Sequence, residues 1–220
     1  MVESFMDELA HAAGQDPIAY RRAILSGKPR ARAVLDLAAE KSGWGTPLPA
    51  GSGRGVSLHD SFGSYPAVVV ELAVTPYGEV KLRRVVAAVD CGETINPDTV
   101  AAQVEGGLVF GLSAALYGDI TFEGGRVQQS NFNDYRMMRM NETPPIEVHH
   151  IRNRENPGGI GETGTVSAAP ALVNAIFAAT GKRLRRYPVD RRALISPETG
   201  NRAISGLPVI GPHWVVRGEC

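Results

Sequence analysis

A run rich in β-branched residues decides the fold: Tyr65-Pro66-Ala67-Val68-Val69-Val70-Glu71-Leu72-Ala73-Val74-Thr75. The turn signal Pro76-Tyr77-Gly78 follows it, and a second apolar run extends from Val80 to Val89. Val, Ile and aromatic residues favour strands, and Pro and Gly between two such runs favour a tight connection. The stretch therefore predicts two antiparallel strands joined as a hairpin. Residues 55–62 predict a strand before this hairpin.

Upstream of this hairpin the sequence changes from strand-like to helical periodicity. Apolar residues at helical spacing predict a helix that ends at Gly14, and Asp16-Pro17 begins a second helix that reaches about Leu25. A third helix is predicted from Arg30 to Ser42. Residues 44–54 are rich in Gly and Pro, which is typical of a linker. We therefore expect a helical segment at 1–43, a linker at 44–54, a main unit at 55–195 and an irregular tail at 196–220.

Downstream, Asn96-Pro97-Asp98 begins a helix in which apolar residues recur every fourth position. Gly106, Gly107 and Gly111 lie in this helix, and each glycine weakens a helix by roughly 1 kcal/mol relative to Ala. Some neighbour must therefore pack very close to it. The glycines at Glu123-Gly124-Gly125 predict a hairpin between strands at 116–121 and 126–129. A last strand is predicted at 146–151.

The turn Gly158-Gly159-Ile160-Gly161-Glu162-Thr163-Gly164 is the strongest candidate for a functional site. It lies before a helix of small residues predicted from about Ala168 to Thr180. Glycine allows the backbone to approach a ligand closely, and a carboxylate shielded there from water is suited to abstracting a proton. The alternative is a solvated Glu162 in a surface loop, which composition alone favours.

The same residues also match the dinucleotide-binding pattern, as Gly159-x-Gly161-x-x-Gly164. That pattern should directly follow a strand and begin an uninterrupted helix within repeated βαβ units. Here residues 152–158 intervene, and Pro170 lies near the start of the helix. The pattern is not a P-loop, because no Lys follows Gly164. A nucleotide-binding oxidoreductase therefore remains the weaker interpretation.

Composition excludes several other classes of protein. The 23 Lys and Arg balance the 23 Asp and Glu, so charge gives no case for binding nucleic acid or an anionic membrane. The two cysteines lack the spacing of a zinc or iron–sulfur site. No run approaches the roughly 18 apolar residues of a membrane span. His149 and His150 adjoin on a predicted strand, so they point to opposite faces. The residues therefore predict no protein ligand to a metal.

Several ordered blocks carry a resemblance to a known family. These are Val89-Asp90-Cys91-Gly92 with Asn96-Pro97-Asp98, Gln103-Val104-Glu105-Gly106-Gly107-x-x-x-Gly111-Leu112, and Gly159-Ile160-Gly161-Glu162. Over residues 2 to about 190 the chain resembles the large molybdopterin-binding subunit of the xanthine dehydrogenase/aldehyde oxidase family. Phe132-Asn133-Asp134-Tyr135 and residues 175–181 are similar to its isoquinoline 1-oxidoreductase-like and aldehyde dehydrogenase-like members. Thr163 stands where many of these relatives have Pro.

The resemblance implies a role for each matching residue. Glu162 is expected to be the general base of a molybdenum hydroxylase, an enzyme that oxidises an aldehyde or an N-heterocycle with water as oxygen donor. The cofactor is expected to be molybdopterin with molybdenum, in the cytosine dinucleotide form. The residues expected to bind it are Gln103, Gly106, Gly107, Gly159 and Gly161.

The resemblance also implies a fold and partners. The expected fold is α+β, a helical leader followed by a mixed sheet packed with helices, as in the C-terminal molybdopterin-binding domain of such a subunit. A [2Fe–2S] small subunit and an upstream part of the large subunit are expected partners, and the chain alone is expected to be inactive. A catalytically silent fragment that only associates with other chains is the second alternative. The compartment and the substrate remain open.

Overall fold

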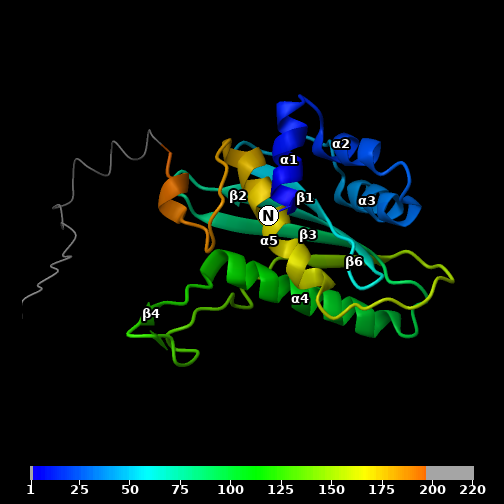
Figure 1. Ribbon diagram of the computed structural model, residues 1–220. Coiled ribbons are helices and arrows are strands. Elements are labelled where there is room, and N and C mark those ends of the chain that lie inside the picture. The colour runs from blue at the N-terminus through cyan, green and yellow to red at the C-terminus, as the bar shows by residue number, and fades with distance from the viewer. Residues whose placement is uncertain (1, 197–220) are drawn as a thin grey trace, which may run out of the picture.

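The computed structural model describes residues 2–196 and has an α+β fold, as expected. Figure 1 shows a central sheet with helices on both faces. The helices and strands are α1 Val2–Ala12, α2 Pro17–Ile24, α3 Pro29–Ser42, β1 Ser52–Leu58, β2 Tyr65–Val74, β3 Val80–Asp90, α4 Pro97–Tyr117, β4 Phe122–Glu123, β5 Arg126–Val127, β6 Ile146–His150, α5 Thr163–Thr180 and a 3₁₀ helix Arg191–Leu194.

The main sheet has the strand order β1-β2-β3-β6 and is mixed. Strands β2 and β3 form the predicted antiparallel hairpin, with Tyr65 opposite Asp90 and a register shift between Glu71 and Leu72. Strand β6 runs parallel to β3, and α4 forms the connection between them. A parallel partner requires such a crossover, because a tight turn joins only antiparallel neighbours.

Two cores lie on opposite faces of this sheet. Val68 and Val70 point into the core with α4 and α5, whereas Val69 points into the core with α2 and α3. Successive side chains of a strand alternate between faces, so the continuous run of valines is buried on both sides. The helical segment shares the second core with the sheet. The division into segments at residues 43, 54 and 195 remains a prediction, and all of the predicted tail except Ser196 lies outside the described residues.

Helix α5 packs on β1 through backbone as well as side chains. A Cβ atom added to Gly55 would overlap the backbone of Ala175, and one added to Gly53 would lie 2.5 Å from the carbonyl oxygen of Ala175. Helix α5 begins at Thr163 and not at Ala168, because Pro170 removes only one intrahelical hydrogen bond and does not end the helix.

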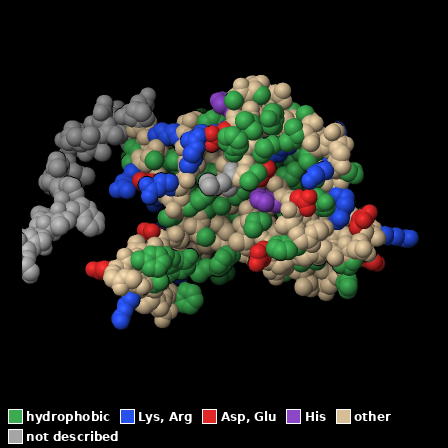
Figure 2. Space-filling view, in the orientation of Figure 1, with side chains coloured by type: hydrophobic (Ala, Val, Ile, Leu, Met, Phe, Trp, Pro, Cys, Tyr) green, Lys and Arg blue, Asp and Glu red, His purple; other side chains and the backbone are tan. Residues whose placement is uncertain are grey.

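The predicted strand at 116–121 is wrong, because α4 continues to Tyr117 and ends at Gly118. The hairpin consists of only the short strands β4 and β5 around Gly124 and Gly125, which both have positive φ. Residues 118–134, around β4, form an arm that projects from the body (Figure 1). Apolar side chains gather on it in Figure 2. Phe122 is 71% exposed and Phe132 is 75% exposed.

Helices α4 and α5 are long and apolar enough to span a membrane by length and composition alone. Here they pack against each other and contribute to the same core, with 61% of the residues of α5 buried. Two glycines of α4 lie at this contact. A Cβ on Gly111 would lie 2.6 Å from the carbonyl oxygen of Thr165. A Cβ on Gly107 would lie 3.1 Å from the backbone nitrogen of Thr165. The close neighbour predicted from the glycines of α4 is therefore α5.

Replacing Gly111 with Ala is expected to lower the free energy of unfolding by about 1–3 kcal/mol, because the methyl group overpacks the contact between the helices. Gly106→Ala is the matched control on the same helix, since no heavy atom lies within 4 Å of its Cβ position. This control is expected to raise stability by up to about 1 kcal/mol. Urea unfolding measures both changes. Equal effects of the two substitutions would contradict a close contact between α4 and α5 at Gly111.

Candidate functional site

The candidate site lies where α4 and α5 begin, at the C-terminal end of β3. Gln103 and Glu162, far apart in the sequence, lie close together there, because Gln103 Nε2 donates a 2.8 Å hydrogen bond to the carbonyl oxygen of Gly161. Asn96 caps α4, and its side chain accepts a hydrogen bond from the N–H of Thr99. The structure thus brings together Gln103, Gly161 and Glu162, three of the residues expected at the site.

Glu162 is the N-cap residue of α5, and its side chain makes no capping hydrogen bond. The residues on both sides of it are fixed. Gly161 is held by Gln103, Thr163 is fully buried, and a Cβ on Gly164 would lie 2.5 Å from the carbonyl oxygen of Val104. The backbone that carries the carboxylate is therefore firmly placed at the junction of the two helices.

The expected shielding of Glu162 is not provided by the described residues. Glu162, Gln103 and Gly161 are all exposed. Burial of the site therefore requires something that covers this surface. The carboxylate makes no hydrogen bond to the first turn of its own helix.

The glycines expected to bind the cofactor divide into two groups. Gly106 and Gly161 have open space at their Cβ positions, whereas Gly107 is buried against α5. Gly159 lies against Phe62, and its N–H donates a 2.7 Å hydrogen bond to the Phe62 carbonyl oxygen. Open backbone is thus available at Gly106 and Gly161, while Gly107 serves helix packing.

Sequence reasoning missed the turn Ser61–Ser64, which lies beside the glycine-rich loop. Phe62 has a φ of 55° and is 65% exposed, and Gly63 follows it with a φ of 76°. Positive φ is rare for a large residue and costs of order 1 kcal/mol or more. The sequence signal was the dipeptide Phe62-Gly63 in a tight turn, where Asn-Gly is usual.

The residues present fit a large polar ligand such as molybdopterin. The hydroxyl oxygens of Ser61 and Ser64 are buried and have no hydrogen-bond partner among the described residues. Buried polar atoms in native structures are nearly always satisfied, so each of these two hydroxyls can make a further hydrogen bond, to water or to a ligand. Gly106 and Gly161 add backbone that a ligand can approach. Within residues 2–196, no group of three or more His, Cys, Asp or Glu side chains is placed to hold a metal ion directly.

The loop 152–162 is held by the turn that follows β3. Glu93 N–H donates to the carbonyl oxygen of Glu155, and Gly158 N–H donates to that of Cys91. Asp90, at the end of β3, is 1% exposed and accepts two hydrogen bonds from Arg30. Burial acts to raise the pKa of Asp90, but hydrogen bonds from Arg30 and from the N–H of Gly92 outweigh it and hold the pKa below its usual range.

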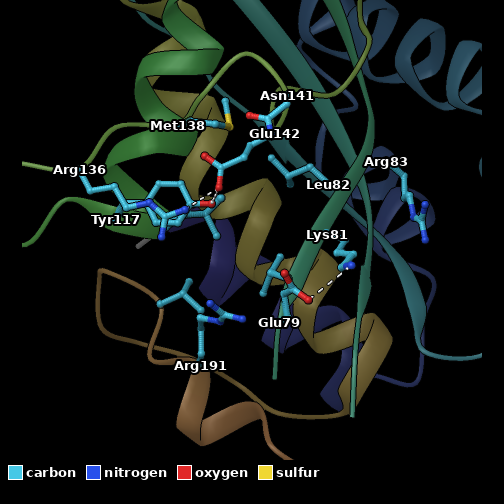
Figure 3. Close-up of a pocket in the computed structure, with 13 residues that line it drawn as sticks. Glu79, Lys81, Leu82, Arg83, Tyr117, Arg136, Met138, Asn141, Glu142 and Arg191 are labelled. Atoms are coloured by element: carbon cyan, nitrogen blue, oxygen red, sulfur yellow. Dashed lines mark hydrogen bonds and ion pairs between the residues drawn. The ribbon is translucent and has the colours of Figure 1, made fainter. Parts of the chain in front are cut away.

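A separate cavity of about 450 Å³ lies at the opposite end of β3 and α4. Figure 3 shows Arg136 beside Tyr117, with Glu142 accepting hydrogen bonds from both. Burial and the charge of Glu142 raise the pKa of Tyr117. Glu79 and Lys81 form a second ion pair in the lining. None of the residues expected at the site lines this cavity.

Replacing Gln103 with Leu is expected to loosen the loop at Gly161, because one hydrogen bond worth about 1 kcal/mol is lost. Amide hydrogen exchange in residues 158–162 should become roughly fivefold faster. Gln15→Leu is the control, since Gln15 is exposed and makes no side-chain hydrogen bond to a described residue. Unchanged exchange in Gln103→Leu would show that the bond does not fix the loop.

Comparison with known proteins identifies the family. Residues 6–144 match the model of the molybdopterin cofactor-binding domain. The chain is 35% identical to the beta subunit of isoquinoline 1-oxidoreductase from Brevundimonas diminuta, over 85% of this chain and 24% of that protein. It is also 35% identical to the large subunit of nicotine 6-hydroxylase from Paenarthrobacter nicotinovorans, over 64% of this chain and 18% of that protein.

A solved structure shows the same fold. Reconstituted CO dehydrogenase from Oligotropha carboxidovorans superposes with a TM-score of 0.54 and 26% identity, over 63% of this chain and 18% of that one. The chain thus spans about a quarter or less of the length of these relatives. It belongs to the molybdopterin cofactor-binding domain family, which confirms the resemblance to the xanthine dehydrogenase/aldehyde oxidase family.

Proposed function

We propose that this chain forms part of the large subunit of a molybdenum hydroxylase that oxidises an N-heterocycle or an aldehyde with water as oxygen donor. Glu162 is the general base. The observation that carries this proposal is the fixed position of Glu162 at the start of α5, next to open glycine backbone. A general base must be held within hydrogen-bond reach of the proton that it takes, and fixed backbone on both sides of Glu162 supports such placement.

The residues around Glu162 hold the cofactor in this proposal. Gln103 and the exposed backbone at Gly106, Gly159 and Gly161 contact it, and Gly107 supports them through its contact with α5. The bound cofactor supplies the two-electron oxidation of the substrate. Glu162 accepts a proton at a carboxylate oxygen, and Gln103 keeps the neighbouring peptide oriented through its bond to Gly161.

The chain acts together with other protein segments in this proposal and is inactive alone. Exposure of Glu162 supports this, because a covered active site shields its charges from bulk solvent and so strengthens the interactions of a catalytic carboxylate. The exposed apolar side chains of the arm 118–134 also support it, since such patches mark contact surfaces. The proposed partners are the rest of the large subunit and a [2Fe–2S] small subunit, and the proposed cofactor form is the cytosine dinucleotide. The chain has only two cysteines, in keeping with a cluster held by a partner.

The dinucleotide-binding alternative has little support. The pattern Gly159-x-Gly161-x-x-Gly164 follows an irregular segment that begins at Ile151, and not the end of a strand. Its last glycine is covered by α4. The main sheet of the described residues has one parallel pair, β3 with β6, whereas the dinucleotide fold has a largely parallel sheet.

Glu162→Gln in the complete subunit is expected to lower kcat by about 10²- to 10⁴-fold, because an amide cannot accept the proton. The KM should change little, since the amide has the same shape. Substrate oxidation is measured with an artificial electron acceptor, and molybdenum content is measured on the same sample.

Glu123→Gln is the control, an exposed glutamate in the short hairpin of β4 and β5. It is expected to keep wild-type turnover. Near wild-type turnover of Glu162→Gln at full molybdenum content would refute the general base and favour a catalytically silent chain.

A further inference from the structure

Helix α3 and the candidate site lie on different parts of the sheet, yet one side chain connects them. Arg30, in the first turn of α3, reaches the end of β3 and forms a bidentate ion pair with Asp90, with nitrogen–oxygen distances of 2.9 and 2.6 Å. The guanidinium group also lies over the ring of Tyr65, 4.8 Å from its centroid. Tyr65 begins β2 directly after the turn Ser61–Ser64.

Asp90 connects Arg30 to the turn after β3, because it binds Arg30 and Gly92 at the same time. Its Oδ1 also accepts a 3.0 Å hydrogen bond from the N–H of Gly92. Gly92 has a φ of 74°, and a Cβ there would overlap the carbonyl oxygen of Asn156. Any other residue at this position would therefore push the turn and the loop 152–162 apart.

The loop 152–162 depends on this turn for its position. It contains no helix or strand before α5. Two backbone hydrogen bonds join it to the turn that follows β3, and a third joins the residue directly before it, Ile151, to the end of β3. Ile151 N–H donates to Val89, Glu93 N–H donates to Glu155, and Gly158 N–H donates to Cys91, all to carbonyl oxygens. Glu162 lies four residues after Gly158, within about 14 Å of chain.

The guanidinium group of Arg30 also contacts the strand that follows the turn Ser61–Ser64, and this turn contacts the glycine-rich loop. Tyr65 and Asp90 are opposite each other in the β2–β3 pair. The Phe62 carbonyl oxygen accepts from Gly159 N–H, and a Cβ on Gly158 would lie 2.5 Å from Ser64 Oγ. Both turns that contact the glycine-rich loop thus adjoin residues that Arg30 contacts.

We propose that Arg30 is a positioning residue for Glu162, which acts through Asp90 and Tyr65 on the two turns that hold the glycine-rich loop. The inference rests on the proposed function of Glu162. The guanidinium is required because its planar fork makes two parallel bonds to Asp90 while its face lies on Tyr65. A lysine ammonium has no planar fork and cannot make both contacts in this geometry.

The test compares Arg30→Met and Arg30→Lys with wild type in the complete molybdenum-loaded subunit complex. Amide exchange in residues 152–162 is expected to become at least about tenfold faster. The kcat is expected to fall about ten- to hundredfold with KM changed less than about threefold, because a small displacement of a catalytic group is costly while substrate contacts remain. Arg30→Lys is expected to recover stability but not the slow exchange or the kcat.

The matched control is Arg54→Met. Arg54 forms a partly buried pair with Glu71 at 2.9 Å, also on the sheet but away from the loop 152–162. It is expected to lower stability and leave exchange in 152–162 and kcat unchanged. Wild-type exchange and kcat in both Arg30 variants, or equal effects of Arg54→Met, would overturn the proposal.

The outcomes also separate this proposal from that for Glu162. Faster exchange in Arg30→Met together with full turnover of Glu162→Gln would support the loop anchor and refute the general base. Loss of turnover in Glu162→Gln with no change in either Arg30 variant would refute the anchor alone.

Discussion

Helices α4 and α5 touch through backbone as well as side chains, and this contact fixes where Glu162 lies. Gly107 and Gly111 of α4 and Gly164 of α5 bring the two helices so close that an added Cβ would meet backbone of the other helix. Glycines in a helix reduce its intrinsic stability, so their presence is explained only by the contact that they allow. The same contact places Gln103 within hydrogen-bond distance of Gly161. A change in the helix contact would therefore move the candidate site.

The sheet packs against α4 and α5 and stabilises their contact. Helix α5 lies on β1 through Gly53 and Gly55, and Val68, Val70 and Leu72 of β2 fill the core beneath both helices. In proteins most of the stability of a helix comes from tertiary packing of its apolar face, so the core beneath α4 and α5 stabilises both. On the opposite face, α3 packs on β2 and β3 and sends Arg30 to the end of β3. Both faces of the sheet thus contribute to the loop that carries Glu162.

Much of this could be predicted from local sequence. The hairpin of β2 and β3, the three leading helices and the start of α4 follow from β-branched runs, caps and turn residues. The length of α4 and the start of α5 could not be predicted, because Gly118 and Pro170 are ambiguous until the packing of the helices is known. The glycines of α4 correctly indicated a close neighbour, but only the structure identifies α5 as that neighbour. The proximity of Gln103 to Gly161 and the contact of Phe62 with Gly159 join residues far apart in the chain, and no local pattern encodes them.

The exposure of Glu162 in this chain makes its surroundings in the complete protein decisive. The most direct measurement is an experimental structure of the complete cofactor-loaded large subunit. The account predicts that the carboxylate of Glu162 is covered and lies within hydrogen-bond reach, about 2.6–3.2 Å, of a group bound at the molybdenum centre. A carboxylate that still points into bulk solvent, with the cofactor held elsewhere, would contradict it.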